Sequence, residues 1–176
     1  MPSDEEEYEP DPESVARKIL LDQLTGRART RKELGDKLAS KQVPDEIATR
    51  LLDRFTDVGL IDDAAFARLW VDQRQSATGK GLARRALAQE LRRKGVDDET
   101  AREVLDEIDP ASEEDAARVL VRRKLRSLAR FDDTTATRRL VGMLARKGYS
   151  SGLAFAVVRD ELAQAGRDEP QEPHSI

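Results

Sequence analysis

The chain has 176 residues, enough for one domain with a substantial core or for a short array of smaller units. Charged residues make up 38% and aromatic residues only 4%, a balance typical of helices with one apolar stripe and a wide solvated face. The chain has no Cys and one His, His174, which excludes a disulfide framework, a Cys-rich zinc site and a Ser–His–acid catalytic arrangement. We therefore expect an all-α protein that is not an enzyme and has no cofactor.

The formal net charge of -4 is unevenly distributed along the chain. Residues 1–13 contain acids and no base, and residues 163–176 are also acidic, so the intervening residues 14–162 carry a net positive charge. The acidic N-terminus is unlike a signal peptide, and no apolar run approaches the roughly 18 residues of a membrane span. We expect two disordered tails, a cytoplasmic location without membrane contact, and a basic body that suits a polyanion or an acidic protein face.

The first group of three predicted helices spans residues 14–62. A helix over Val15–Leu24 precedes a second helix that begins after Thr30, where Glu33 three residues later completes a capping-box pattern. Pro44 suits the first turn of the third helix.

Two further groups follow the same order. In residues 63–109, the first helix is expected over Phe66–Gln75, and Asp62, just before this group, is a good N-cap for it. In residues 110–162, the first helix is expected over Ala117–Leu128.

A repeat with a period of 53 residues connects the three groups, because equivalent positions on the second and third helices are apolar in every group. We predict that these positions form the core. The aromatic side chains of Phe66, Trp70, Phe131 and Tyr149 are expected to pack in the core rather than stack on nucleic-acid bases. One such unit cannot bury its apolar face alone, so three tandem three-helix repeats should stack into an elongated, curved array. The predicted core residues are Leu34, Leu38, Leu52, Phe66, Trp70, Leu87, Leu91, Leu105, Leu140, Leu144, Tyr149 and Val158.

The turn after the second helix carries a Lys-Gly pair in two of the repeats. Gly95 and Gly148 stand where a helix ends in a left-handed residue, and Lys94 and Lys147 place a cation near the negative end of the helix dipole. The first repeat has Gln42 instead, and a left-handed conformation there would cost about 1 kcal/mol. We therefore expect a different cap after the second helix of the first repeat.

Two motifs resemble ligand sites, but neither is predicted to bind a ligand. The segment Thr78–Gly81 is similar to a phosphate-binding loop, but Gly81 occupies the position where Ser or Thr is needed, and no strand precedes it. The acidic pairs at 62–63, 97–98 and 132–133 fall at helix starts, where carboxylates act as caps, and no His or Cys completes a metal site.

An ordered set of motifs gives the chain its resemblance to a known family. The set comprises Gly59-Leu60-Ile61-Asp62-Asp63, then Phe66-Ala67 and Trp70, then Glu90-Leu91 and Lys94-Gly95-Val96, and finally Arg138-Arg139-Leu140 with Arg146-Lys147-Gly148-Tyr149. Over about residues 15–162 the chain resembles the bacterial regulatory proteins of the RecX family. It departs from their pattern at Gln42, at Thr137 where the other repeats have Arg, and in the acidic N-terminal tail.

The resemblance implies a negative regulator of the RecA recombinase that acts as a monomer. Its implied partner is RecA protein and the RecA filament on single-stranded DNA, with only weak binding to free DNA. Binding in the filament groove or at the filament end would then inhibit ATP hydrolysis, LexA cleavage and strand exchange.

Cations that recur in the same register form the candidate binding surface. A row of positive charge along the array would suit a regular polyanion, and neutralisation of phosphates would make the affinity depend on salt. The candidate partner-binding and nucleic-acid-binding residues are Lys32, Arg84, Arg85, Arg92, Arg93, Arg122, Arg123, Lys124, Arg126, Arg138, Arg139, Arg146 and Lys147.

Two other functions stay open at this point. Two helices joined by a tight turn resemble a helix-turn-helix, so the chain could be a direct DNA-binding helical regulator. Against this, the third helices begin with acids, Asp45 and Glu46 or Asp98 and Glu99, which DNA phosphates repel. A helical scaffold without a nucleic-acid partner would leave the order of the motifs unexplained.

Overall fold

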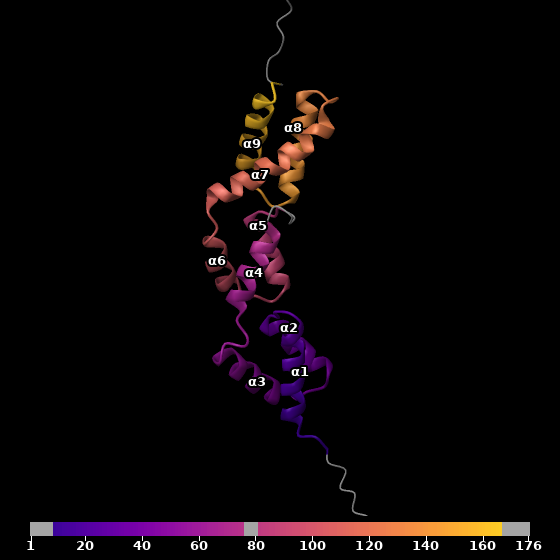
Figure 1. Ribbon diagram of the computed structural model, residues 1–176, viewed down its shortest axis with the longest axis vertical. Helices are drawn as coiled ribbons and strands as arrows, with labels where there is room; N and C mark the ends of the chain where they lie inside the picture. The colour runs from indigo at the N-terminus through magenta and orange to yellow at the C-terminus, as the bar shows by residue number, and fades with distance from the viewer. Residues whose placement is uncertain (1–8, 76–80, 167–176) are drawn as a thin grey trace, which may run out of the picture.

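The computed structural model describes residues 9–75 and 81–166, and within them the chain is helical with no strand. The prediction of an all-α array of three three-helix repeats is confirmed. Figure 1 shows the three units stacked along one long axis into an elongated, curved body, with α1 near one end and α9 near the other.

Each repeat contains a first, a second and a third helix. In repeat 1 these are α1 (Pro12–Gly26), α2 (Arg31–Ser40) and α3 (Asp45–Asp57). In repeat 2 they are α4 (Asp63–Gln75), α5 (Arg84–Arg93) and α6 (Asp98–Asp106). In repeat 3 they are α7 (Pro110–Leu125), which continues into the 3-10 turn η1 (Arg126–Leu128), α8 (Asp133–Arg146) and α9 (Ser151–Gln164).

The inner ends of the two predicted disordered tails are helical, which corrects the predicted bounds at these residues. Residues 12 and 13 belong to α1, and residues 163 and 164 belong to α9. Residues 1–8 and 167–176 of these predicted tails lie outside the described residues, as does the segment Thr78–Lys80 of the rejected phosphate-loop motif.

Side-chain caps begin four of the helices at positions expected from the sequence, which are Thr30, Asp62, Asp97 and Asp132. Thr30 forms both bonds of the capping box with Glu33. The Ala65 N–H donates to Asp62 Oδ1 at 2.9 Å. Hydrogen bonds from Thr100 and Thr135 lower the pKa of Asp97 and Asp132, respectively. The acidic pairs are thus occupied in helix capping, and the described residues hold no cluster of His, Cys, Asp or Glu that could bind a metal ion.

The prediction of a different cap after α2 is wrong. Gln42 adopts φ 59°, in the same left-handed region as Gly95 at 84° and Gly148 at 92°. The turn is closed by the same type of hydrogen bond as in the other repeats, from Val43 N–H to the Leu38 carbonyl at 3.1 Å. The turn geometry therefore prevails over the preference of Gln for negative φ, at a cost of about 1 kcal/mol.

Each repeat has its own hydrophobic core. All of the predicted core side chains are buried except Trp70 and Phe131, which are partly buried. Trp70 stacks on Phe66 with 5.8 Å between ring centroids, and its indole Nε1–H donates to Glu90 Oε2 at 2.8 Å. Its polar edge therefore explains its intermediate burial. None of the helices in the described ranges is long and apolar enough to cross a membrane.

Candidate partner-binding surface

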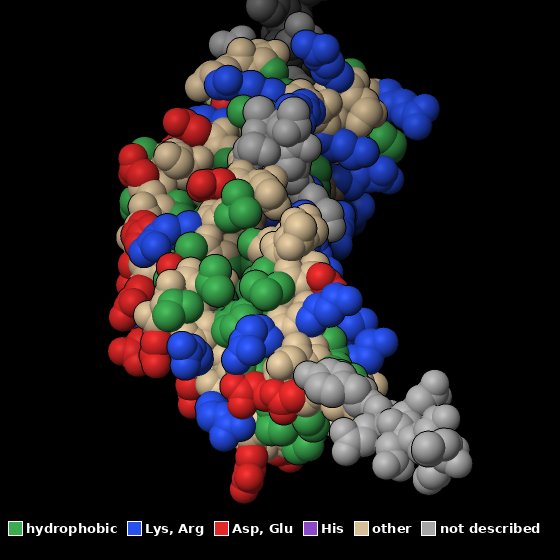
Figure 2. Space-filling view, turned by 60° about the horizontal axis from the view of Figure 1, so that its bottom comes forward, with side chains coloured by type: hydrophobic (Ala, Val, Ile, Leu, Met, Phe, Trp, Pro, Cys, Tyr) green, Lys and Arg blue, Asp and Glu red, His purple; other side chains and the backbone are tan. Residues whose placement is uncertain are grey.

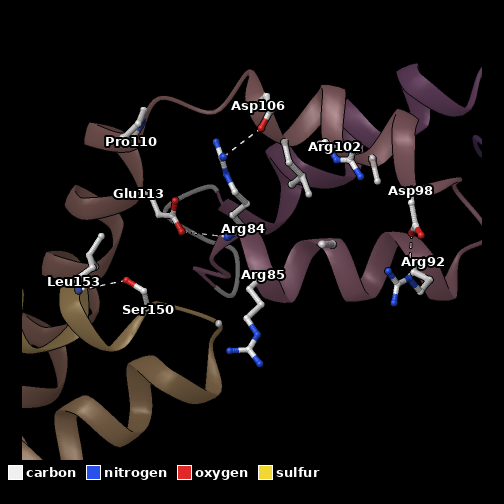
Figure 3. Close-up of a pocket in the computed structure, with 14 residues that line it drawn as sticks. Arg84, Arg85, Arg92, Asp98, Arg102, Asp106, Pro110, Glu113, Ser150 and Leu153 are labelled. Carbon is white, nitrogen blue, oxygen red and sulfur yellow. Dashed lines mark hydrogen bonds and ion pairs between the residues drawn. The ribbon is translucent and has the colours of Figure 1, made fainter.

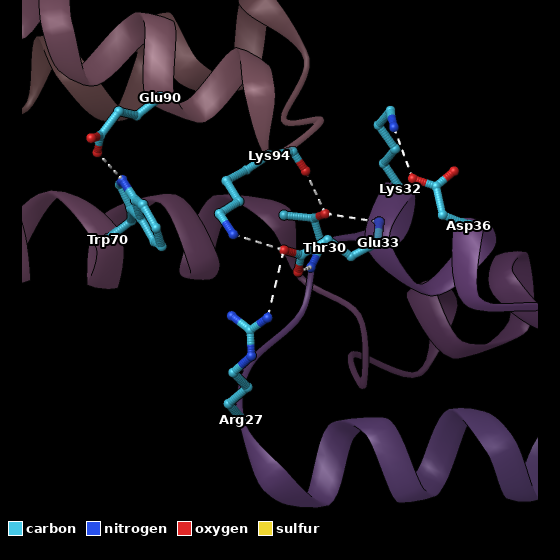
Figure 4. A network of polar contacts seen from close by, with 8 residues as sticks. All are labelled: Arg27, Thr30, Lys32, Glu33, Asp36, Trp70, Glu90 and Lys94. Atoms are coloured by element: carbon cyan, nitrogen blue, oxygen red, sulfur yellow. Dashed lines mark hydrogen bonds and ion pairs between the residues drawn. The ribbon is translucent and has the colours of Figure 1, made fainter.

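The second helices of the three repeats lie head to tail, and the contacts between repeats produce this order. In the joint between repeats 1 and 2, called the first joint below, the C-terminal end of α5 meets the N-terminus of α2 (Figure 4). The fully buried Thr30 hydroxyl donates to the Lys94 carbonyl at 2.6 Å, and Lys94 Nζ pairs with Glu33 Oε1 at 3.1 Å. Arg27 lies 3.9 Å from the same Glu33 oxygen.

The second joint, between repeats 2 and 3, has the same plan with different atoms. Ala83 stands one period after Thr30 and has no hydroxyl, so its backbone N–H donates to the Lys147 carbonyl at 2.9 Å. The buried Tyr149 hydroxyl adds a bond to the Gly81 carbonyl at 2.9 Å. Burial, with a smaller contribution from Glu113, raises the pKa of Tyr149 to about 12.

A carboxylate from the following repeat completes each joint. Asp63 Oδ1 accepts the Arg31 N–H at 2.9 Å, and Glu113 Oε1 accepts the Arg84 N–H at 3.2 Å. Both donors are first-turn N–H groups without an intrahelical acceptor, so each acid satisfies the N-terminus of a second helix. Burial raises the pKa of Asp63, although the bond from Arg31 opposes the shift.

The glycines after α5 and α8 are required by these joints as well as by their turns. A Cβ on Gly95 would lie 2.3 Å from the Lys32 side chain, and one on Gly148 would lie 2.6 Å from the Ala86 backbone nitrogen. In repeat 1 the equivalent position is the exposed Gln42, which takes part in neither joint. The joints thus hold α2, α5 and α8 end to end, and we call these three helices the second-helix row.

The second-helix row carries most of the candidate cations on its surface. Arg85, Arg93 and Arg146 are exposed and form no salt bridge within residues 9–75 and 81–166. Lys32 pairs with Asp36 at 2.8 Å and Arg92 with Asp98 at 3.1 Å, but these pairs are solvent-exposed and contribute little to stability. The sequence register and the head-to-tail packing therefore place the cations in one continuous series.

Most of the candidate cations are exposed to solvent, and two are partly buried. Arg139 lies over the Phe131 ring at 4.3 Å. The exposed candidates are Lys32, Arg85, Arg92, Arg93, Arg122, Arg123, Lys124, Arg126, Arg138, Arg139 and Arg146, and the partly buried ones are Arg84 and Lys147.

The two long edges of the array differ in charge. Figure 2 shows Lys and Arg side chains gathered along its right edge and Asp and Glu side chains along its left edge. Because this view is turned about the horizontal axis, left and right are those of Figure 1, where α3 and α6 lie on the left. The helix α6 carries Asp98, Glu99, Glu103 and Asp106 against Arg102.

Arg122, from the basic stretch of α7, has a structural contact that sequence reasoning missed. Its Nε and terminal nitrogen donate to the two carboxylate oxygens of Glu161 at 2.7 and 3.0 Å. Glu161 is only 3% exposed. Its hydrogen bond with Arg122 is the largest cause of the raised pKa of the Arg122 guanidinium. The signal was present in the sequence, because Glu161 follows Val157 and Val158 at helical spacing on an apolar face.

The geometry defines a class of protein: a tandem array of three-helix repeats with one basic edge and one acidic edge. Family models for RecX match each repeat in turn. The first, second and third three-helix domains of RecX match residues 16–55, 62–105 and 112–158, respectively.

Relatives named Regulatory protein RecX are similar along most of the chain. The one from Mycobacterium avium is 54% identical over 157 residues, covering 88% of this chain and 89% of the relative. The one from Thermobifida fusca is 52% identical over 151 residues, covering 86% and 80%. A crystal structure of RecX from Lactobacillus salivarius has the same fold, with a TM-score of 0.80 at 21% identity, covering 86% of this chain and 97% of that one. The chain belongs to the RecX family of regulatory proteins.

Proposed function

We propose that this RecX-family chain is a non-enzymatic negative regulator of the RecA recombinase. It binds the RecA filament on single-stranded DNA, in the filament groove or at the filament end, and so inhibits ATP hydrolysis, LexA cleavage and strand exchange. The observation that carries the proposal is the second-helix row, in which exposed arginines recur with the repeat along a rigid edge.

A repetitive edge suits a repetitive partner. Each repeat contributes a modest set of charges, and simultaneous contacts with successive filament subunits raise the overall affinity through effective concentration. Inhibition then requires only a body that bridges neighbouring subunits and resists their rearrangement, without an active site. The exposed arginines also account for weak binding to free DNA, which salt should suppress.

Sequence-specific reading of duplex DNA receives less support. A recognition helix presents its N-terminal residues to base edges. Two of the three third helices begin instead with exposed acids, Asp45 and Glu46 in α3 and Asp98 and Glu99 in α6. These carboxylates would repel the phosphates on either side of a groove.

Single-stranded-DNA-dependent ATP hydrolysis by RecA tests the proposal. The wild-type chain, titrated from below stoichiometric amounts, should inhibit hydrolysis. The row variant Arg85→Glu/Arg93→Glu/Arg146→Glu should need at least about tenfold more protein for the same inhibition, because it reverses three exposed positive charges of the row. The matched control Arg17→Glu/Arg54→Glu/Arg159→Glu changes net charge equally, on exposed residues away from the row.

The possible outcomes test the proposed function and the assignment of the second-helix row separately. An inactive wild-type chain at every ratio would contradict the proposed function. Equal loss of inhibition in the row variant and the control would contradict the assignment of the second-helix row, leaving only a dependence on net charge.

A further inference from the structure

A groove opens beside the second joint, on the side of α5 that faces α6 (Figure 3). Its volume is about 650 Å³, and it lies between α5 and α6 on one side and the start of α7 with the α8–α9 turn on the other. Four arginines line it: Arg84, Arg85, Arg92 and Arg102. Only three of them were candidates from the sequence, since Arg102 belongs to the acidic helix α6.

Two of the four arginines have hydrogen-bond or salt-bridge partners, and two have no salt bridge in the described parts of the chain. Arg84 donates to Asp106 at 3.3 Å and to the Ile108 carbonyl at 3.4 Å, and Arg92 pairs with Asp98 at 3.1 Å. Arg85 and Arg102 are exposed, and neither has a salt-bridge partner in the described parts of the chain. The groove lining therefore includes two guanidinium groups without a salt bridge, Arg85 from α5 and Arg102 from α6.

The remainder of the lining is apolar or acidic. Ala88, Leu105 and Leu153 supply apolar surface, while Asp106 and Glu113 place carboxylates at the joint end of the groove. A continuous phosphate chain would meet those carboxylates and leave the apolar surface uncovered. A peptide with separated carboxylates and an apolar side chain between them satisfies both parts of the lining.

We propose that this groove docks an extended acidic segment of a protein partner, with one bulky apolar side chain seated between its carboxylates. Arg85 and Arg102 pair with the carboxylates, and the apolar side chain lies against Ala88, Leu105 and Leu153. The inference rests on the proposed function in assigning the groove to the protein component of a filament. Arg85 belongs to both the groove and the second-helix row, whereas Arg93 and Arg146 of the row lie outside the groove lining.

Fluorescence anisotropy with a fluorescein-labelled peptide of alternating Asp, Glu and Phe residues tests the inference. The full chain should bind this peptide at least about tenfold more tightly than a version with Asn and Gln in place of the acids. Replacement of Phe by Ser should also weaken binding, which a purely electrostatic surface would not show. Labelled oligothymidylate serves as the nucleic-acid probe.

Variants locate the binding surface. Arg85→Glu/Arg102→Glu should lose the peptide by at least about tenfold, and Arg102→Glu alone by about threefold or more. The matched row variant Arg93→Glu/Arg146→Glu should retain peptide affinity within about twofold and lose oligothymidylate instead. Thermal melting followed by circular dichroism checks that each variant is folded, which exposed positions should permit.

Three results would overturn the groove assignment. In the first, the wild-type chain fails to bind the acidic Phe peptide. In the second, the groove variant and the row variant lose peptide affinity equally. In the third, oligothymidylate displaces the peptide, and the displacement depends on Arg102. The last outcome would make the groove part of a nucleic-acid surface. A chain that binds the peptide yet leaves RecA ATP hydrolysis unchanged would retain the groove and remove the proposed function.

Discussion

Substitution of Gly148 by Ala should damage the second joint more than the turn itself. Gly148 has φ 92°, a conformation that costs an L-residue about 1–2 kcal/mol. The added Cβ would also lie 2.6 Å from the Ala86 nitrogen and 2.8 Å from its Cβ, so α5 and α8 must separate. Overpacking of this kind costs about 1–3 kcal/mol, which brings the expected loss to about 2–5 kcal/mol.

Gly59 supplies a matched control within the same chain. Its φ is 80°, but a Cβ there would have no atom within 4 Å. Gly59→Ala should therefore lose only the conformational part, about 1–2 kcal/mol. Equilibrium urea unfolding followed by circular dichroism measures both variants, and small-angle X-ray scattering reports any change in the shape of the array.

The comparison isolates the contact between repeats. Equal losses in the free energy of unfolding for Gly148→Ala and Gly59→Ala would refute the argument that the turn after α8 is constrained by the preceding repeat. A larger loss at Gly148 together with an altered scattering profile would support it.

Three further outcomes are expected from the same structure. Gln42→Gly should raise the free energy of unfolding by about 1 kcal/mol, because it relieves a left-handed residue that has no joint to fill, and a decrease in the urea midpoint would contradict this. Arg122→Glu should lose about 2–4 kcal/mol, because it places a second carboxylate beside the buried Glu161 and leaves that acid only the longer pair with Arg118 at 3.7 Å, whereas exposed Arg126→Glu should stay within about 0.5 kcal/mol; similar melting of the two would count against the structural role of Arg122. Tyr149 has a folded pKa of about 12 against an ordinary value of 10.0, so its contribution is complete below pH 10 and is lost as pH rises toward 12. Tyr149→Phe should lack this alkaline loss and cost about 1–2 kcal/mol at neutral pH, and alkaline titrations that superimpose with wild type would disprove the assignment.

The repeat period predicted most of the fold because burial acts on each helix locally. Apolar residues at helical spacing are buried wherever the helix packs, so the core of each repeat followed from the pattern. Trp70 is the instructive exception, since its indole N–H needs Glu90 and its ring keeps one edge near solvent.

Contacts between repeats were beyond the sequence because they join residues far apart in the chain. Thr30 looked like an ordinary N-cap, and its additional bond to the Lys94 carbonyl depends on how two repeats pack. The error at Gln42 has a local origin, because the turn after α2 closes within repeat 1 through the bond from the Val43 N–H to the Leu38 carbonyl. A conformational penalty of about 1 kcal/mol is smaller than the packing of the hydrophobic residues that flank the turn.

Arg122 shows a similar limit for the candidate site. Local charge density favoured a binding role for the whole basic stretch of α7, but charge density does not reveal which guanidinium faces a neighbouring helix. The repeat register of the cations said more about their arrangement than their local density did, because cations at equivalent positions lie on second helices that the joints hold end to end.

The joints also determine how many units the array can hold. Each joint needs a residue without a Cβ at the turn of one repeat and a bare N-terminus on the second helix of the repeat before it. Gln42 does not meet the first requirement, so no unit can be added upstream of repeat 1 by the same contact. At the other end, α8 starts at Asp133, one turn earlier than the register of α2 and α5, so Ala136 lies inside the helix, whereas Thr30 and Ala83 at the equivalent positions precede theirs. The arrangement of residues that forms the two joints is therefore not present in the same register at either end of repeats 1 to 3.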